Sequence, residues 1–220
     1  MRGEVELIAD HQHLRRVVQE GMLRAGVSLE VATADFKAML VPPGTQAHAG
    51  GRDGAGGRRG PGGRGRNRSS RFASSAPSII EHFRTLADRG VEVRVLHAGV
   101  PSGPALQQLK TPQGPVARSM DDAGRMAARG GVTVRRCPRL HAKAVVVDAE
   151  WMYLGSANLT GAGLGAKGPT RRNFEWGVIS RDATLIDAVL GRFNALWEGE
   201  PCAGCGRRDV CPVPLEEPDL

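Results

Sequence analysis

Strand-like and helix-like patterns alternate along almost the whole of this 220-residue chain, and that alternation limits the folds open to it. Strands show apolar residues at every second position or in short runs, whereas helices show them every three or four residues. A chain that alternates the two is typical of a sheet covered by helices, so we expect one α/β sandwich. The length suffices for one such core with a small appendage, but not for two full-sized domains.

The bounds of the predicted elements follow from these patterns and from the residues that cap them. Asp10 can begin a helix over 11–25 that Gly26 ends, and Ser78 can begin one that Gly90 closes. Further helices are expected in a short stretch that ends at 42–43, over 119–129 and over 182–197. Strands are expected over 27–33, 91–96, 132–136, 140–147, 151–154 and 173–180, with a loop over 99–117.

The positive charge of the chain is concentrated in one segment, about 44–76. Of the net charge of +7, this segment supplies seven arginines against a single acid. The segment has ten glycines and almost no large apolar side chain, which predicts a disordered insert, because little burial offsets the entropy of ordering it. An arginine–glycine arm of this kind can bind the phosphate backbones of nucleic acids. Low-complexity drift in a GC-rich genome is the alternative explanation, since the chain holds 26 arginines and only 4 lysines, so the segment is supporting evidence only.

The sequence favours a cytoplasmic protein. No apolar run approaches the roughly 18–20 residues that cross a bilayer, so we expect no transmembrane segment. Glu4 and Glu6 stand where a secretion signal needs an apolar stretch.

Polar residues converge in the region from 139 to 158. His141 and Lys143 are two apart on a predicted strand, so both side chains leave the same face. If a two-residue turn follows Asp148, Lys143 lies opposite Ser156 and His141 opposite Asn158. A nucleophile, a cation, a hydroxyl and an amide on one face suit a phosphate group. Asp148 has the opposite parity and lies about 20 Å along the strand from His141, so we assign it to stabilising the turn.

The spacing H-x-K-x4-D-x6-G-S-x-N resembles the motif of the phospholipase D superfamily at all six fixed positions. Those positions are His141, Lys143, Asp148, Gly155, Ser156 and Asn158. The resemblance extends over most of residues 4–198 and implies a phospholipase D-like α/β/α sandwich with a mixed sheet and one motif per chain. We therefore predict a phospholipase D-like domain over 1–198, interrupted by the insert, and a cysteine-containing tail over 199–220.

The same resemblance implies the chemistry. Members of the superfamily are phosphodiesterases or phosphatidyl and nucleotidyl transferases that work through a covalent phosphohistidine and need no catalytic metal. His141 would be the nucleophile, Lys143 and Asn158 would hold the phosphoryl oxygens, and Ser156 would assist in the pocket. The family also has a downstream acid that hydrogen-bonds the histidine, for which Glu175 is the candidate.

Such a mechanism needs two histidines, one to attack phosphorus and one to protonate the leaving oxygen. No other histidine is followed two residues later by lysine. We therefore expect a symmetric homodimer with two copies of His141 at the two-fold axis, whose coupled titration gives a bell-shaped pH–rate profile. We treat His11 and His13 as solvated residues at a helix start, and His97 as a loop histidine.

Four cysteines suggest a structural metal site. Three of them form the tail pattern Cys202-x2-Cys205-x5-Cys211, and Cys137 precedes His141 by four residues. Cytosolic thiols at this spacing favour a closed zinc site over disulfides, although four unligated thiols or an iron–sulfur cluster also fit the spacing.

Three functions are compatible with these features. The first is a homodimeric, metal-independent nuclease. The second is a phospholipase D or phosphatidyltransferase of the cardiolipin type, which uses the same histidine chemistry on lipid headgroups and for which a basic arm is also suited. The third is a nucleic-acid-binding module with a vestigial site, which the intact set of motif residues disfavours.

Overall fold

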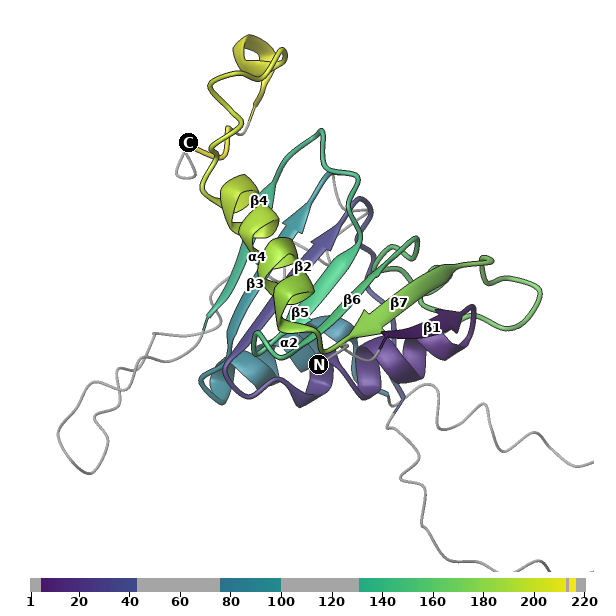
Figure 1. Ribbon diagram of the computed structural model, residues 1–220. Coiled ribbons are helices and arrows are strands. Elements are labelled where there is room, and N and C mark those ends of the chain that lie inside the picture. The colour runs from purple at the N-terminus through teal and green to yellow at the C-terminus, as the bar shows by residue number, and fades with distance from the viewer. Residues whose placement is uncertain (1–4, 43–75, 100–130, 213, 217–220) are drawn as a thin grey trace, which may run out of the picture.

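The computed structural model describes residues 5–42, 76–99, 131–212 and 214–216 (Figure 1), and the structural statements below concern these residues. Almost all of the predicted basic insert, most of the predicted loop over 99–117 and the whole predicted helix over 119–129 lie outside them.

A seven-stranded mixed sheet forms the centre of the fold, in the order β1-β7-β6-β5-β2-β3-β4. β2, β3 and β4 run parallel, whereas all other neighbouring strands are antiparallel. This confirms the predicted α/β class with a mixed sheet. The strands are β1 (Val5–Ala9), β2 (Ser28–Thr33), β3 (Glu92–His97), β4 (Val132–Arg136), β5 (Ala144–Val147), β6 (Trp151–Gly155) and β7 (Trp176–Ser180).

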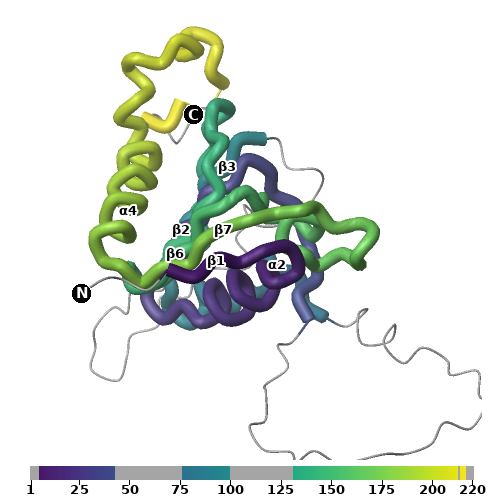
Figure 2. Tube along the Cα trace, turned by 45° about the vertical axis from the view of Figure 1, so that its right-hand side comes forward, coloured from purple at the N-terminus to yellow at the C-terminus, as the bar shows by residue number. Residues whose placement is uncertain are grey.

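Helices cover both faces of this sheet (Figures 1 and 2). One face carries α2 (Ile79–Asp88) and two short irregular helices, η1 (Leu14–Gln19) and η2 (Met22–Arg24), which pack together on the sheet. The long helix α4 (Ala183–Trp197) crosses the other face and leads into the tail, where η3 (Arg208–Val210) is the last helix.

A buried ion pair holds α4 against the sheet. The Arg94 guanidinium lies 3.0 Å from the carboxylate of Glu30, which is only 3% exposed. The same guanidinium donates to Asn194 Oδ1 at 3.0 Å and stacks over the Phe193 and Trp197 rings at 5.2 and 5.6 Å from their centroids. Pairing and stacking together offset the cost of burying these two charges.

Most predicted elements occur with shifted ends, because capping residues mark where helices begin. Ser78 and Glu81 form a reciprocal capping box at the start of α2, and the Asp182 carboxylate caps α4. β5 is shorter than predicted, and the segment before it that holds His141 is not a strand.

The N-terminal region differs from its prediction. β1 was not predicted, and the single helix expected over 11–25 is divided into η1 and η2 at Gly21. A Cβ on Gly21 would lie 2.6 Å from the Trp151 ring, so close packing against the sheet decides the chain path there. The predicted short helix ending at 42–43 is also wrong, since 34–42 is irregular and joins the fold by the bridges Phe36↔Leu159 and Leu40↔Ser78.

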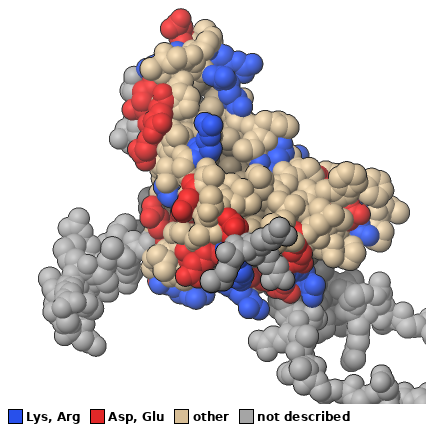
Figure 3. Space-filling model, in the orientation of Figure 1, with Lys and Arg blue, Asp and Glu red and all other residues tan. Residues whose placement is uncertain are grey.

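Charges of both signs are interspersed over the described surface, with no continuous basic face in the view of Figure 3. The observation agrees with the sequence, which places nearly all of the excess positive charge in the segment about 44–76. Among the described helices, none combines the length and apolarity needed to cross a membrane.

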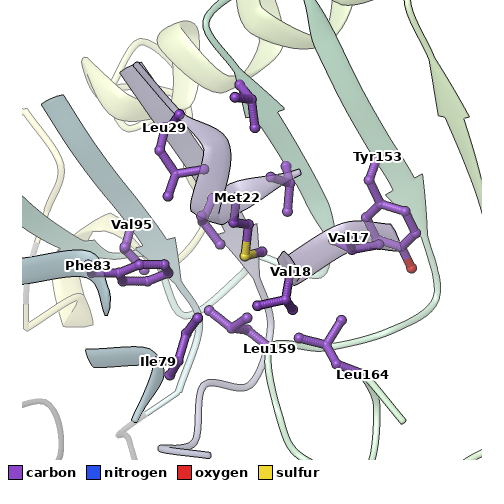
Figure 4. Packing of buried hydrophobic residues seen from close by; sticks show 14 of the residues in the cluster. Val17, Val18, Met22, Leu29, Ile79, Phe83, Val95, Tyr153, Leu159 and Leu164 are labelled. Atoms are coloured by element: carbon purple, nitrogen blue, oxygen red, sulfur yellow. The ribbon is translucent and has the colours of Figure 1, made fainter. Parts of the chain in front are cut away.

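The main core lies between the sheet and the helices η1, η2 and α2 (Figure 4). Val17 and Met22 from the irregular helices and Phe83 from α2 meet Leu29 and Tyr153 from the strands, all at most 1% exposed. This packing fixes the strand ends from which the candidate site residues project.

Replacing Phe83 by alanine should lower the free energy of unfolding by about 3–5 kcal/mol, because the ring is fully buried and leaves a cavity. Val210→Ala, at a residue that is 80% exposed in the tail, should change it by less than about 0.5 kcal/mol. Chemical denaturation of both variants checks that Phe83 lies in the core and Val210 at the surface. Equal stabilities of the two variants would contradict this placement.

Candidate active site

The motif residues meet at one end of the sheet, where β6 ends and β5 and β7 begin. His141 and Lys143 lie directly before β5, Ser156 and Asn158 directly after β6, and Glu175 directly before β7. The Gly155 N–H donates to the Lys143 carbonyl at 3.1 Å, and the Ser156 N–H donates to the Trp176 carbonyl at 2.9 Å. Backbone hydrogen bonds therefore bring the three segments side by side.

Lys143 contacts the candidate nucleophile. Its ammonium lies 3.2 Å from Nδ1 and 3.1 Å from Nε2 of His141, and donates to the His141 carbonyl at 2.8 Å. Lys143 is 8% exposed, whereas His141 is exposed. Burial lowers the pKa of the Lys143 ammonium, and the negative charge of Glu175 acts against that shift. The pair presents an open imidazole with a cation beside it.

Glu175 is a buried carboxylate at the same end of the sheet. It is 8% exposed and accepts hydrogen bonds from the Ser156 hydroxyl and, at 3.0 Å, from Asn173 Nδ2. The hydrogen bonds of the described residues link Glu175 to Ser156 and Lys143 to His141, but none joins Glu175 to His141 directly. The two pairs interact through the charges of Lys143 and Glu175.

Asn158 is fixed by the loop that follows β2. Its Oδ1 accepts from the Asp35 N–H at 3.0 Å and from the Thr33 hydroxyl at 3.4 Å. Because Oδ1 is occupied, the Nδ2 donors are the atoms that Asn158 can offer to a phosphoryl oxygen.

The predicted hairpin register is wrong by one residue. Val147 pairs with Trp151, so Lys143 aligns with Gly155 instead of Ser156, and three residues form the turn. The reason is the turn itself, since Asp148 and Ala149 both adopt left-handed φ angles of 53° and 54°. The polar residues still gather at one end of the sheet.

Asp148 lies at that turn, at the opposite end of β5 from His141. Its carboxylate accepts from the backbone N–H groups of Gly26, Val27 and Ser28 at 2.7–3.2 Å. This is the turn-stabilising position expected from its parity, and it places Asp148 away from the candidate catalytic groups.

Close packing explains why residue 155 of the motif is a glycine. A Cβ there would lie 2.6 Å from the Trp176 carbonyl oxygen and would collide with the Tyr153 hydroxyl. Gly177 on β7 likewise leaves room for the Tyr153 ring. Tyr153 is 1% exposed, and its hydroxyl accepts from the Ala157 N–H at 3.3 Å, which orders the turn between Ser156 and Asn158.

Two histidines differ from their predictions, because His13, expected in solvent, and His97, expected in a loop, are both buried. His13 is fully buried, packs edge-on against Tyr153 at 5.4 Å between centroids, and is bonded through Nδ1 to the Asp10 carbonyl at 2.9 Å. Burial lowers the pKa of His13, while the hydrogen bond and the charges of Glu175 and Asp10 oppose the shift. His97, at the end of β3, is 3% exposed. The apolar residues on either side of His13 in the sequence, Ile8, Val17 and Val18, were the available signal that His13 is buried.

The structure does not gather the four cysteines into a metal site. Within the described residues, which include all four, no group of three or more histidines, cysteines or acids is placed to hold a metal. Cys205 instead contacts the Arg139 guanidinium at 3.1 Å, and Cys202 bonds to Glu216. Backbone contact with Arg207 and the Arg139 side chain lower the pKa of Cys205. Structural zinc stays a prediction from sequence.

A family model described as "Cardiolipin synthase, PLD-like domain" matches residues 68–197, more than half of the chain. The chain belongs to the phospholipase D-like family. No curated protein matches this phospholipase D-like chain by sequence.

Solved structures support the same fold for this phospholipase D-like chain. Nuc from Salmonella typhimurium, described as a phospholipase D family member, is 16% identical, with 90% of this chain and 95% of that one covered and a TM-score of 0.52. NucT from Helicobacter pylori is 12% identical, with 90% and 97% covered and a TM-score of 0.52. At these identities the likeness extends to the fold, and the site roles rest on the residues described above.

Removing the Asp148 carboxylate should destabilise the phospholipase D-like fold without removing a catalytic group. Asp148→Ala leaves three backbone donors without their acceptor, so we expect a loss of about 2–3 kcal/mol of unfolding free energy. His141→Ala should leave stability within about 0.5 kcal/mol, since that side chain is exposed. Thermal and urea unfolding compare the two. An unchanged stability of Asp148→Ala would contradict the assigned role.

As the pH rises, phosphate binding should weaken at a lower pH than the one at which an ordinary lysine loses its proton. Burial lowers the pKa of Lys143, so as the pH rises its ammonium loses its proton before an ordinary lysine does. We expect affinity for inorganic phosphate, measured by calorimetry, to fall about tenfold once that proton is lost. Lys143→Arg should keep its affinity, because guanidinium stays charged. A flat profile for the wild type would contradict the shift.

Proposed function

We propose that this phospholipase D-like chain is a nuclease that cleaves phosphodiester bonds through a covalent phosphohistidine on His141, without a catalytic metal and as a homodimer. The observation that carries the proposal is the contact between the exposed His141 imidazole and the buried Lys143 ammonium. A neutral imidazole has one ring nitrogen with a lone pair, which is what a nucleophile requires. The adjacent cation stabilises charge that builds on the phosphoryl oxygens.

The proposed reaction has two steps. A ring nitrogen of His141 attacks phosphorus, the P–O bond to the leaving strand breaks, and His141 of the partner subunit donates its proton to the departing oxygen. Water then attacks the phosphohistidine while the same partner histidine accepts the proton from water. The P–N bond breaks and both histidines return to their starting states. Lys143 and Asn158 Nδ2 hold the non-bridging oxygens throughout.

The loop between Asn158 and Glu175 supports a polyanionic substrate. It carries the cations Lys167, Arg171 and Arg172 and no acid, and it ends at the candidate site. Lys167 and Arg171 are exposed. Cations spaced along a loop suit a substrate with several phosphates, and the arginine-rich segment about 44–76 adds to this charge in the sequence.

An exposed apolar surface supports the homodimer. Leu7, Leu154, Phe174 and Trp176 lie on β1, β6 and β7 or next to them and are 40–92% exposed. They line an open groove of about 540 Å³ that also includes Ser156, so this apolar face is continuous with the candidate site. Burying such a face against a second copy is favourable and brings a second His141 toward the first.

A second candidate function is phospholipid cleavage or phosphatidyl transfer, and one observation favours it. Two apolar cavities of about 250 and 370 Å³ share Ala142 and Leu196, and His141 lines the first. Aliphatic side chains beneath α4 line the second, as an acyl chain would require.

One experiment separates these functions. The purified protein and His141→Ala are incubated with single- and double-stranded DNA, RNA and phospholipid vesicles in excess EDTA. We expect the wild type to cleave nucleic acid in EDTA, and the variant to lose at least 10³-fold in rate, since it lacks the nucleophile.

The other outcomes overturn parts of the proposal. Turnover of vesicles alone would establish the phospholipid function instead. Loss of activity in EDTA, with folding intact by circular dichroism, would contradict metal independence. If both proteins bind nucleic acid equally and neither turns it over, the chain is a binding module and the enzymatic proposal fails.

Trp176→Glu should dissociate the dimer, because it places a charge in the exposed apolar face. Light scattering should show a dimer for the wild type and a monomer for the variant, with activity falling in parallel. Val210→Glu, at an equally exposed apolar residue in the tail, should remain dimeric. If the wild type or Trp176→Glu were a monomer and fully active, the two-histidine mechanism would be contradicted.

A further inference from the structure

The backbone of Glu175 is held by Asp10, a residue near the other end of the sequence. Asp10 follows β1 and lies opposite Glu175, one step beyond the last ladder pair, Ala9↔Trp176. The Asp10 N–H donates to the Glu175 carbonyl at 2.8 Å, and the Glu175 N–H donates to Asp10 Oδ1 at 3.0 Å. Asp10 therefore binds both backbone polar groups of Glu175.

The second of these bonds replaces one that the sheet cannot make. In an antiparallel pair the Glu175 N–H would donate to the Asp10 carbonyl. Asp10 has a left-handed φ of 47°, and its carbonyl instead accepts from the His13 N–H at 3.2 Å and from His13 Nδ1 at 2.9 Å. The side-chain oxygen takes the place of the carbonyl, so the Asp10 carboxylate keeps Glu175 in line at the point where the sheet ends.

The turn around Asp10 is itself firmly placed. Gln12 Oε1 accepts from the Ala9 N–H at 2.8 Å, and buried His13 packs against Tyr153. Gly165, from the loop between Asn158 and Glu175, packs so closely that a Cβ would lie 2.8 Å from the Asp10 carbonyl oxygen. The N-terminal segment thus meets the segment that holds Gly165 and Glu175, which is distant in the sequence, at Asp10.

We propose that Asp10 is a positioning residue of the active site, whose carboxylate fixes the backbone of Glu175 and so aims the Glu175 carboxylate at Ser156 and toward Lys143. The inference rests on the proposed function, because it assigns Asp10 a part in the same site. Asp10 lies outside residues 68–197, which match the family model.

The left-handed backbone at Asp10 allows a clean test. Asp10→Gly removes the acceptor but accepts the φ angle without strain, and Asp10→Asn keeps an acceptor oxygen, tolerates the angle and removes the charge. Ala149→Gly, at another left-handed position with φ of 54°, is the matched control for introducing glycine. Phosphate affinity is measured against pH for all three, together with kcat and KM on the substrate that the wild type cleaves.

The expected result is a change confined to Asp10→Gly. If Glu175 is displaced, its charge supports the Lys143 ammonium less, so the alkaline loss of phosphate binding should move to lower pH by at least half a unit. We expect kcat to fall about tenfold with little change in KM. Asp10→Asn and Ala149→Gly should follow the wild type in both measurements.

Other results overturn the inference, separately from the proposed function. A normal phosphate profile in folded Asp10→Gly refutes the positioning role, even if the wild type is an active nuclease. If Asp10→Gly shows the shifted phosphate profile but the wild type has no nuclease activity, the role of Asp10 is supported and the proposed function is refuted. If Asp10→Gly fails to fold by circular dichroism while Ala149→Gly folds, Asp10 is a residue of the fold and the positioning role is rejected.

Discussion

The buried charges of Lys143 and Glu175 are the constraint on which the arrangement of the candidate site depends. Each side chain is 8% exposed, and each would be costly to bury without partners. The Ser156 hydroxyl and Asn173 offset the cost for the carboxylate, whereas the ammonium is held by the backbone and ring of His141. A cation and an anion fixed in this way keep an electrostatic field at the exposed imidazole before any substrate arrives.

The surrounding fold can be understood as support for these two charges. Tyr153 packs closely against Gly155 on β6 and Gly177 on β7, next to the positions of Ser156 and Glu175. At the opposite end of β5, Asp148 ties the hairpin turn to the start of β2. The helix α4 is anchored independently by the Glu30–Arg94 pair and leaves the apolar face of β6, β7 and β1 uncovered in the described structure.

The sequence predicted those parts of the site that depend on spacing. His141, Lys143, Ser156 and Asn158 are close in the chain, so a motif finds them even though the assumed register was one residue wrong. Glu175 was reached through the resemblance and its place on the next strand. Asp10 and His13 were misassigned because they contact Glu175 and Tyr153, which are distant in the sequence. A helix-cap pattern at Asp10 is also locally indistinguishable from the strand end that the structure shows. Contacts of that range are decided by packing, which no local pattern contains.

The central claim is that His141 becomes covalently attached to the substrate. The most direct measurement is a reaction quenched in alkali within the first turnover, followed by mass spectrometry of the peptide that contains His141. The account predicts a phosphoramidate adduct on His141 in the wild type and none in His141→Ala. Turnover with no adduct on His141, or with an adduct on another residue, would contradict it.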